Sequence, residues 1–510
     1  MPRGRGWTRV ILWAGWAALA VVAYRAAAAA LYRSGFPLDD AWIHQTYARN
    51  LAAGVGWVYR APDLGRGAAT APLWVLILAV GHGLAVPPGL WVSLLGWAGL
   101  VGLAALAWHW PGLEGRWRWV AALAVLGQWH LVWAAVSGME TLAFALAVLA
   151  ALAALARPEP RWGWAALAAG LGLWLRPEAL LLLPVAALRL RDGRDLRGGL
   201  RFAAGVGLAL AAYAAFHLAL AGSWGPTTGP AKMHEYAALR AAPWVWRWLR
   251  VWGPILVGPA ALAVLGLFAV IALRIAKSLS WSTPHSPLPA PRSLLPAPHS
   301  LLPLSWLLLH SALYAWRLPV TYQHGRYMMP VLPALTVVGV LAWQEVLNQA
   351  PAAWRPRLGL ALAALAAGLG LGFLALGARA YAWDVAFIES EMVDTARWVA
   401  EHVPATAVVA AHDIGALGYY APQPLADLAG LLDPEVIPIV RDEAALARYL
   451  QQRGARYLVT FPSWYRELDA CSRPLFVTQA PYASALGGEN MVVYAWQPCP
   501  EGLVPSATPR

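Results

Sequence analysis

The sequence predicts a mostly α-helical, polytopic membrane protein that ends in an extracytoplasmic α/β domain. Hydrophobic residues make up 60% of the 510 residues and charged residues only 13%, whereas roughly a quarter of an ordinary soluble domain is charged. The acidic residues are unevenly placed, with 11 of the 26 in residues 1–380 and the other 15 in residues 384–501. We therefore expect a transmembrane domain over residues 1–381 and a polar domain over residues 382–510.

The excess of basic residues agrees with this class. A net charge of +12 would suggest nucleic acid as the partner of a soluble protein, but here the arginines lie in short loops between apolar runs. This distribution is typical of the cytoplasmic loops of membrane proteins. We expect the lipid bilayer, and no nucleic acid, as a partner.

The transmembrane domain begins with an apolar run over residues 7–31, behind Arg3, Arg5 and Arg9. The run has no convincing cleavage site, so we expect a retained first span with a cytoplasmic N-terminus. The further apolar runs are 90–110, 117–135, 139–156, 162–175, 177–190, 198–221, 251–276, 301–316, 327–346 and 358–381. Together they predict about eleven transmembrane helices.

Three short runs complicate this count. Residues 162–175 and 177–190 fall below the roughly 17 residues that a spanning helix needs, and they meet at Arg176-Pro177-Glu178, so they form either two spans or a broken pair. Residues 70–84 are also short. We expect them to lie flat at the interface, because the basic loops then all fall on the cytoplasmic side.

This topology is that of a multi-pass protein of the plasma (inner) membrane, with the C-terminal domain outside. The Pro-rich near-repeat in residues 278–303 excludes a packed core and predicts a flexible cytoplasmic linker. We expect functional residues on the outward loops. The outward segments are 32–89, which holds interfacial helices, 136–138, 176–178, 222–250, 317–326 and everything after residue 382.

The last part of the chain predicts a small α/β domain. An amphipathic helix is expected over Met392–His402 and a glycine-containing turn over Asp413–Tyr420. Cys471 and Cys499 can form a disulfide only if this domain faces an oxidising compartment, and the sequence leaves their pairing open. The expected strands are Ala407–Ala411, Tyr457–Phe461 and Met491–Trp496.

Asp39 and Asp40 follow the first span directly, with His44 and Arg49 behind them on an expected helix. One carboxylate can cap that helix while the other favours its dipole. Alternatively, one carboxylate is a general base that takes a proton from an acceptor hydroxyl while the other orients a neighbour. The two roles are compatible.

Other ionisable residues stand at expected outer helix ends, where such groups are functional candidates. Arg326, next to His324, can bind phosphate oxygens in bidentate fashion or simply anchor its helix at the interface. Glu140 can bind a sugar hydroxyl or cap the following helix. Arg176 and Glu178 can bind substrate or satisfy each other.

His412 and Asp413 open the expected turn of the C-terminal domain. They either contact the acceptor or are satisfied within the turn. No His/Cys cluster in the sequence has metal-ligand spacing, so we predict no metal ligands, and a role for a divalent metal stays open.

Several separated motifs run through the transmembrane part: Asp39-Asp40-Ala41 with Tyr47–Leu51, Thr70–Trp74, Ser137–Thr141, Arg176-Pro177-Glu178, Ala231-Lys232 and Arg326–Pro333. In order and spacing, they resemble the motifs of the bacterial type C glycosyltransferases of the GT-C superfamily, most closely the branch that includes mycobacterial arabinofuranosyltransferases. The resemblance implies a GT-C-like fold and no cofactor. It also implies a donor sugar linked through phosphate to a polyprenol.

The resemblance also implies residue roles. In the family, the first carboxylate of a similar acidic pair is regarded as the catalytic base, which implies this role for Asp39 with Asp40 as its partner. Lys232 and Arg326 are the candidates to hold the donor phosphate. Lys232 stands where the family carries Asn-Thr-x-Tyr-Ala-Lys, but this chain has Thr227-Thr228-Gly229-Pro230 before Ala231 and lacks the Asn and the Tyr.

We therefore predict an inverting glycosyltransferase that moves a hexosyl or pentosyl group to a hydroxyl of an extracytoplasmic glycan, lipid or protein. The alternative is a transporter or a flippase for lipid-linked sugars. That function would need charged groups near the membrane midplane and a repeat that relates two halves, and we see no such repeat. The further substrate-binding candidates are His44, Arg49, Glu140, Arg176, Glu178 and His324.

Overall fold

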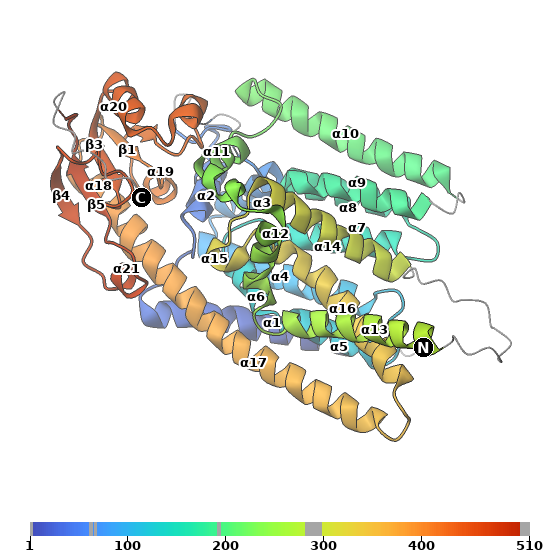
Figure 1. Ribbon diagram of the computed structural model, residues 1–510. Coiled ribbons are helices and arrows are strands. Elements are labelled where there is room, and N and C mark those ends of the chain that lie inside the picture. Colours follow the sequence, from blue (N-terminus) through green and yellow to red (C-terminus); the bar gives the residue numbers. More distant parts are fainter. Residues whose placement is uncertain (1–3, 61–64, 66–68, 191–194, 281–297, 500–510) are drawn as a thin grey trace.

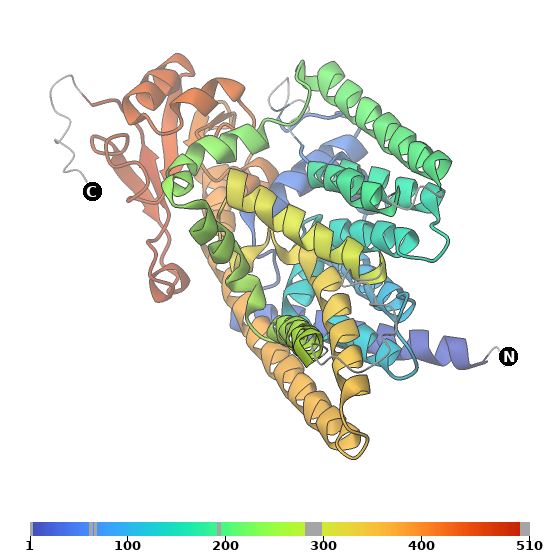
Figure 2. The same cartoon turned by 45° about the vertical axis from the view of Figure 1, so that its right-hand side comes forward.

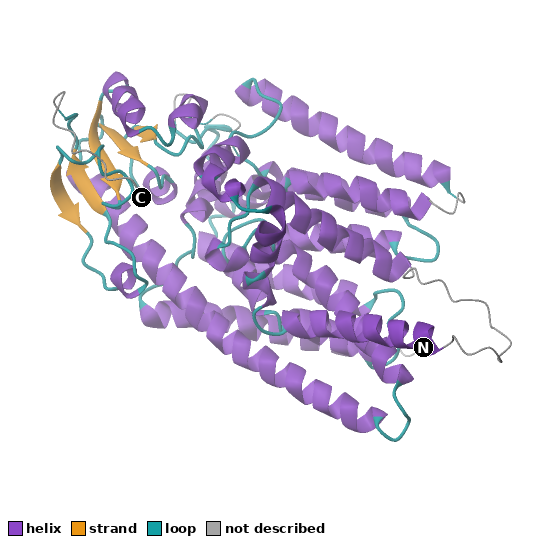
Figure 3. Cartoon of the chain, viewed as in Figure 1, coloured by secondary structure: helices purple, strands orange, loops and turns teal. Residues whose placement is uncertain are grey.

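The computed structural model describes residues 4–60, 65, 69–190, 195–280 and 298–499. Helices dominate it, and a small sheet lies at one end of the helical bundle (Figure 1, Figure 3). Helix α1 (Gly4–Leu31) begins at the opposite end, as the turned view also shows (Figure 2). The start of α1 and the C-terminal sheet, which are expected on opposite membrane faces, thus lie at opposite ends of the bundle.

The described residues contain six helices that are long and apolar enough to cross a membrane, or seven spans if the bent pair α5 and α6 counts as one. The expected count of eleven is therefore not confirmed. Helices α7 (Thr141–Leu155) and α8 (Trp162–Leu175) are shorter than a usual span. Residues 177–190 form only the six-residue helix α9 (Leu182–Ala187) between two 3-10 turns. Pro177 and Pro184 have no backbone N–H to continue a regular helix.

The other helices are α2 (Asp39–Ala52), α3 (Pro72–Gly83), α4 (Pro88–Trp108), α5 (Trp117–Leu126), α6 (Trp129–Val136), α10 (Leu196–Ala221), α11 (Thr228–Glu235), α12 (Trp244–Trp252), α13 (Ala260–Ser280), α14 (Pro298–Arg317), α15 (Tyr322–Gly325), α16 (Leu332–Gln349), α17 (Arg355–Ile388), α18 (Asp394–His402), α19 (Gly415–Tyr420), α20 (Glu443–Gln452) and α21 (Tyr482–Ala485). Of these helices, α4, α10, α14, α16 and α17 overlap predicted apolar runs, the run 117–135 is divided into α5 and α6, and α11, α12, α15, α19, α20 and α21 were not predicted as helices.

Two predicted boundaries can be placed on the helices of the structure. Of the predicted linker 278–303, residues 281–297 lie outside the described residues, while α13 extends to Ser280 and α14 begins at Pro298. The boundary predicted at residue 381 falls inside α17, which continues through a π-helical turn, Glu389–Val393, into α18. The last long helix thus leads directly into the C-terminal domain (Figure 1).

The C-terminal domain contains one five-stranded sheet in the order β2-β1-β3-β5-β4. Strand β1 is parallel to β2 and β3, whereas β5 is antiparallel to β3 and β4. The three predicted strands are confirmed within two residues at each end, β2 and β4 were not predicted, and the predicted turn Asp413–Tyr420 is wrong because it contains helix α19. The strands are β1 (Val408–Ala411), β2 (Leu425–Asp427), β3 (Ala455–Thr460), β4 (Arg473–Val477) and β5 (Val492–Ala495).

The two faces of the sheet pack into two different hydrophobic cores. Val409 and Val493 belong to the core that continues into the helical bundle, whereas Ala410 and Val492 belong to a smaller core with α20. Successive strand residues point to opposite faces, so the sheet packs on the bundle with one face. Cys471 and Cys499, whose pairing the sequence left open, form a disulfide.

Candidate active site

A cavity of about 510 Å³ lies where the bundle meets the C-terminal domain. Most of its lining is apolar, but a cluster of charged side chains also lines it, and we call it the polar cavity after that cluster. Helices α2 and α11 and the turn α15, which leads to Arg326, all lie at the end of the bundle that faces the sheet (Figure 1). Leu431 of the C-terminal domain completes the lining. The predicted site residues that line this polar cavity are Asp40, His44, Glu140, Arg176, Glu178, Lys232 and Arg326.

One wall of the polar cavity holds a carboxylate between two cations. Lys232 Nζ lies 3.1 Å and Arg326 Nη2 2.5 Å from Asp40 Oδ2, and both cations also donate to the Tyr327 hydroxyl, at 3.2 and 3.1 Å. Burial raises the pKa of Asp40, but the charges and hydrogen bonds of Lys232 and Arg326 outweigh it and hold that pKa well below its usual range. Asp40 is therefore ionised, and the wall carries one net positive charge.

Arg326 has hydrogen-bond donors that are not used within the described structure. Its side chain is only 5% exposed, and its Nε and Nη1 atoms are buried without a hydrogen-bond partner in the described structure. A buried guanidinium with unsatisfied N–H groups is costly unless a ligand accepts from them. The residual positive charge and these free donors fit an anion with several oxygens, such as a phosphate.

A second wall of the polar cavity carries an excess of negative charge, because it holds two carboxylates and one arginine. Arg176 donates to Glu140 at 3.1 Å, to Glu178 at 3.2 Å and to the Tyr314 hydroxyl at 2.8 Å, and Tyr314 in turn donates to Glu178. Arg176 and Glu178 thus pair with each other, as one prediction had it. Glu140 Oε2 and Glu178 Oε2 remain buried without a hydrogen-bond partner in the described structure. Such oxygens can accept hydrogen bonds from sugar hydroxyls.

His44 connects the two walls of the polar cavity. It lies one turn after Asp40 on α2, and its Nε2 is 3.5 Å from Glu140 Oε2. Its Nδ1 is buried and has no hydrogen-bond partner among the described residues. Burial lowers the pKa of His44, so the ring is neutral and can donate or accept.

Asp39 lies outside the lining of the polar cavity. Its two carboxylate oxygens accept hydrogen bonds from the backbone N–H groups of Gly415, at 2.6 Å, and Ala416, at 2.8 Å. It therefore caps α19 of the C-terminal domain and not its own helix, whose N-cap residue, Leu38, makes no side-chain cap. A side chain at position 415 would collide with the Asp39 backbone, so this approach needs a glycine. The base role of Asp39 stays a prediction.

The Asp39 cap holds the C-terminal domain against the bundle. Replacing Asp39 by alanine leaves two buried N–H groups without an acceptor, so we expect a loss of about 1–3 kcal/mol of stability. We also expect limited proteolysis to separate the C-terminal domain from the bundle in this variant. Asp442→Ala is the control, because Asp442 caps α20 within the domain. Equal protease resistance of Asp39→Ala and the wild type would show that the cap does not dock the domain.

Two further predicted residues also lie outside the polar cavity. Arg49 donates to the backbone oxygens of Tyr419, at 2.5 Å, and Gly418, at 3.3 Å. This contact strengthens the docking of α19. His324 lies 2.7 Å from Asp384 on α17. Substrate binding by Arg49 and His324 stays a prediction that no contact with the cavity supports.

His412 and Asp413 precede α19 at the same junction. His412 Nδ1 is 2.8 Å from the Tyr465 hydroxyl, and its Nε2 is 3.6 Å from Glu235 of α11. Within the described structure, no hydrogen bond to the Asp413 carboxylate is found. Burial raises the pKa of Asp413 to about 6. His412 is thus satisfied, and Asp413 lies beside the polar cavity without lining it.

Two phenols of the polar cavity, Tyr314 and Tyr327, were not predicted from the sequence. Tyr327 follows Arg326 in a motif that was singled out for its arginine alone. Tyr314 stands near the end of an apolar run, where a tyrosine is usually an interfacial anchor. Only its position next to Arg326 could have indicated that Tyr327 belongs to the site. Nothing in the sequence indicated this for Tyr314.

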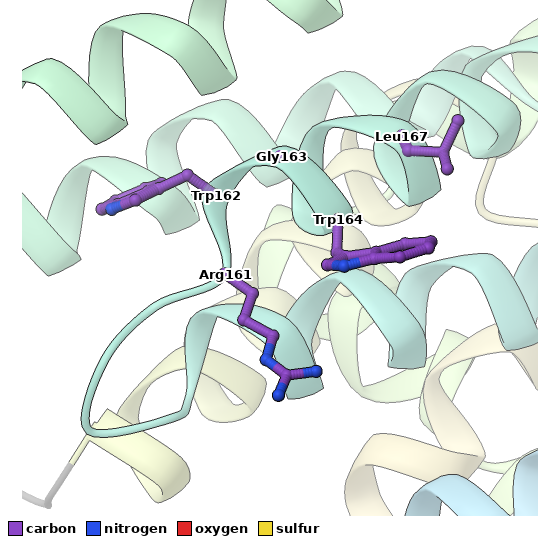
Figure 4. A pocket seen from close by; sticks show the side chains of 5 residues that line it. All are labelled: Arg161, Trp162, Gly163, Trp164 and Leu167. Carbon is purple, nitrogen blue, oxygen red and sulfur yellow. The ribbon is translucent and has the colours of Figure 1, made fainter.

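Two other hollows among the described residues differ from the polar cavity in their lining. One lies at the start of α8, where Trp162 and Trp164 point away from each other and Arg161 lies below them (Figure 4). An exposed tryptophan beside an arginine at a helix end is typical of interfacial anchoring. Another hollow, of about 400 Å³, is lined mainly by apolar side chains of the bundle. No group of three or more His, Cys, Asp and Glu in the described residues is arranged to hold a metal ion.

Solved structures of two proteins are similar to this chain. The structure of ArnT from Cupriavidus metallidurans bound to undecaprenyl phosphate is 17% identical with a TM-score of 0.53, over 96% of this chain and 98% of that chain. The apo structure of the same protein is 18% identical with a TM-score of 0.54, over 97% and 98%. Arabinosyltransferase EmbB from Mycobacterium smegmatis is 15% identical with a TM-score of 0.41, over 94% of this chain and 46% of that chain.

The two ArnT structures match nearly the full length of both chains, so this chain has the GT-C fold. The fold expected from the motifs is therefore confirmed, and with the apolar helices it makes the chain a multi-pass membrane protein. Residues 380–494 match a family described as Domain of unknown function (DUF8728). No curated protein matches the sequence.

Proposed function

We propose that this chain is a membrane glycosyltransferase that takes its sugar from a polyprenyl-phosphate donor. One observation carries the proposal: Lys232 and Arg326 share a single carboxylate, Asp40, and Arg326 keeps two buried N–H groups free at the polar cavity. A donor phosphate would supply the missing acceptors and the missing negative charge. The ArnT structure with undecaprenyl phosphate shows that a protein of this fold binds such a lipid.

In the proposed reaction, an acceptor hydroxyl attacks the anomeric carbon from the side opposite the phosphate, which inverts the configuration. The bond from that carbon to the phosphate oxygen breaks, and its electron pair leaves with the polyprenyl phosphate. The hydroxyl proton passes to a carboxylate. Lys232 and Arg326 stabilise the charge that develops on the leaving phosphate.

We assign the base to Asp40, the member of the predicted pair that lines the polar cavity. Before the donor binds, Lys232 and Arg326 hold the pKa of Asp40 low, which makes it a weak base. When the donor phosphate engages the two cations, their effect on Asp40 decreases and its basicity rises. Asp39, whose oxygens both bind α19, keeps the C-terminal domain in place.

The second wall suits the sugar of the donor. The free oxygens of Glu140 and Glu178 and the free nitrogen of His44 can each bind a hydroxyl group. In the proposed topology the cavity opens on the outer face of the plasma membrane, and the acceptor is a glycan, lipid or protein there. A transporter is less well supported, because these charged groups gather at one end of the bundle and not at its centre.

The test is transfer in proteoliposomes that contain labelled polyprenyl-phosphate pentose or hexose, with an envelope extract as the acceptor source. We expect labelled product and free polyprenyl phosphate from the wild type. Lys232→Met should lower the rate roughly 10- to 100-fold, because a charge-assisted contact is lost. Lys277→Met, which changes the only other lysine in the sequence, should leave it unchanged. Movement of the intact lipid-linked sugar across the bilayer without transfer would instead identify a flippase.

A further inference from the structure

The backbone just before Arg326 adopts a conformation that most residues avoid. Gln323 has φ 52° and ψ 50°, His324 has φ 58° and ψ 26°, and Gly325 has φ 71°. Three successive residues are thus left-handed, and two of them carry side chains. For such residues this region is sterically disfavoured. The turn therefore needs contacts from outside to hold it.

One carboxylate supplies such contacts. Asp384 Oδ2, on α17, lies 2.7 Å from His324 Nε2 and also accepts the indole N–H of Trp133 at 2.8 Å. The His324 ring packs edge-on against Trp129 and Trp133, with centroids 5.2 and 5.6 Å apart. His324 is thus fixed on both its polar and its apolar sides, by α6 and α17.

Gly325 fixes the other end of the turn. Its N–H donates to the Thr321 oxygen at 3.2 Å, and its own oxygen accepts from Met328 at 2.8 Å. A Cβ at this position would lie 3.0 Å from Pro254 Cβ, so the turn packs closely on the neighbouring segment. The next residue is Arg326, whose guanidinium reaches Asp40.

We propose that Asp384, by holding His324 in its left-handed conformation, is a positioning residue that presents Arg326 to the donor phosphate. This inference rests on the proposed function of the polar cavity. It gives α17, the helix that leads into the C-terminal domain, a part in shaping the phosphate site. It also gives His324 a role other than direct contact with the substrate.

The test compares glycine and alanine at position 324, since both remove the bond to Asp384 but only alanine resists a positive φ. The probe is undecaprenyl phosphate, titrated into each variant in nanodiscs. We expect His324→Ala and Asp384→Ala to weaken binding roughly tenfold, as release of backbone strain of this kind predicts. His324→Gly should retain most of the affinity. Asp394→Asn, on the adjoining helix α18 and paired with Arg33, is the control and should bind like the wild type.

The outcomes separate this inference from the function on which it rests. Equal losses in His324→Gly and His324→Ala, or unchanged binding in Asp384→Ala, would overturn the positioning role. Arg326→Met is measured in parallel, and full binding by that variant would overturn the phosphate site itself. Melting temperatures are recorded for each variant, so that a weaker affinity counts only where the protein stays folded at the assay temperature.

Discussion

Arg326→Met is expected to lower the rate of sugar transfer roughly 100- to 1000-fold, the usual effect of removing one preorganised donor from a developing negative charge. Arg326 is the most deeply buried cation of the Asp40 wall, and it keeps two N–H groups free for the phosphate. Methionine has a similar reach without charge or donors, so packing changes little. The measurement is the initial rate of transfer from a labelled polyprenyl-phosphate sugar in proteoliposomes.

Two comparisons make this prediction specific. Arg326→Lys keeps the charge but loses the planar fork of donors, so we expect a rate between those of Arg326→Met and the wild type. Arg473→Met removes an exposed arginine of β4 and should have no effect. A rate for Arg326→Met within a factor of about two of the wild type, well below the smallest effect expected here, would exclude Arg326 from the phosphate site.

Asp40→Asn is expected to lower the transfer rate roughly 100- to 10,000-fold, the range typical of a lost general base. Binding of undecaprenyl phosphate should change in the opposite direction. Asp40 is the counter-ion of Lys232 and Arg326, so its neutral isostere leaves both cations available to the lipid phosphate. Slower transfer together with equal or tighter binding is the signature of a carboxylate that competes with the phosphate and then acts as base.

The Asp40 prediction has its own control. Asp442→Asn changes a cap of α20 at a residue that does not line the polar cavity, and should leave both transfer and binding unchanged. Transfer by Asp40→Asn at the wild-type rate would show that Asp40 is not the general base. Loss of binding together with transfer would show instead that Asp40 is needed to keep the two buried cations in place.

The sequence predicted the membrane class because apolar runs and basic loops are properties of composition and spacing. The expected count of about eleven spans is not confirmed, because the length of an apolar run does not show where the helix breaks. Residues 177–190 form a short helix between 3-10 turns. Strand β2 was not predicted because it is only three residues long. Strand β4 was not predicted because Pro474 interrupts its strand pattern.

The site residues, too, were predicted only in part from the sequence. Asp39 and Asp40 are neighbours on one helix, so their side chains point in different directions and only one of them lines the cavity. Nothing in a single sequence tells which, since that depends on how α2 packs against α19. Lys232 and Arg326 were singled out as separate cations, but their shared contact with Asp40 follows from tertiary structure. Asp384 could not be chosen at all, because its partner lies 60 residues away.

The most direct test of the central claim compares undecaprenyl phosphate with undecaprenol, which has the same chain and no phosphate, in binding to the protein in nanodiscs. We predict that the phosphate lipid binds at least roughly tenfold more tightly. We also predict that the Lys232→Met/Arg326→Met double variant loses this difference. Equal affinity of the wild type for the two lipids, or a preference that survives in the double variant, would contradict a phosphate site in the polar cavity.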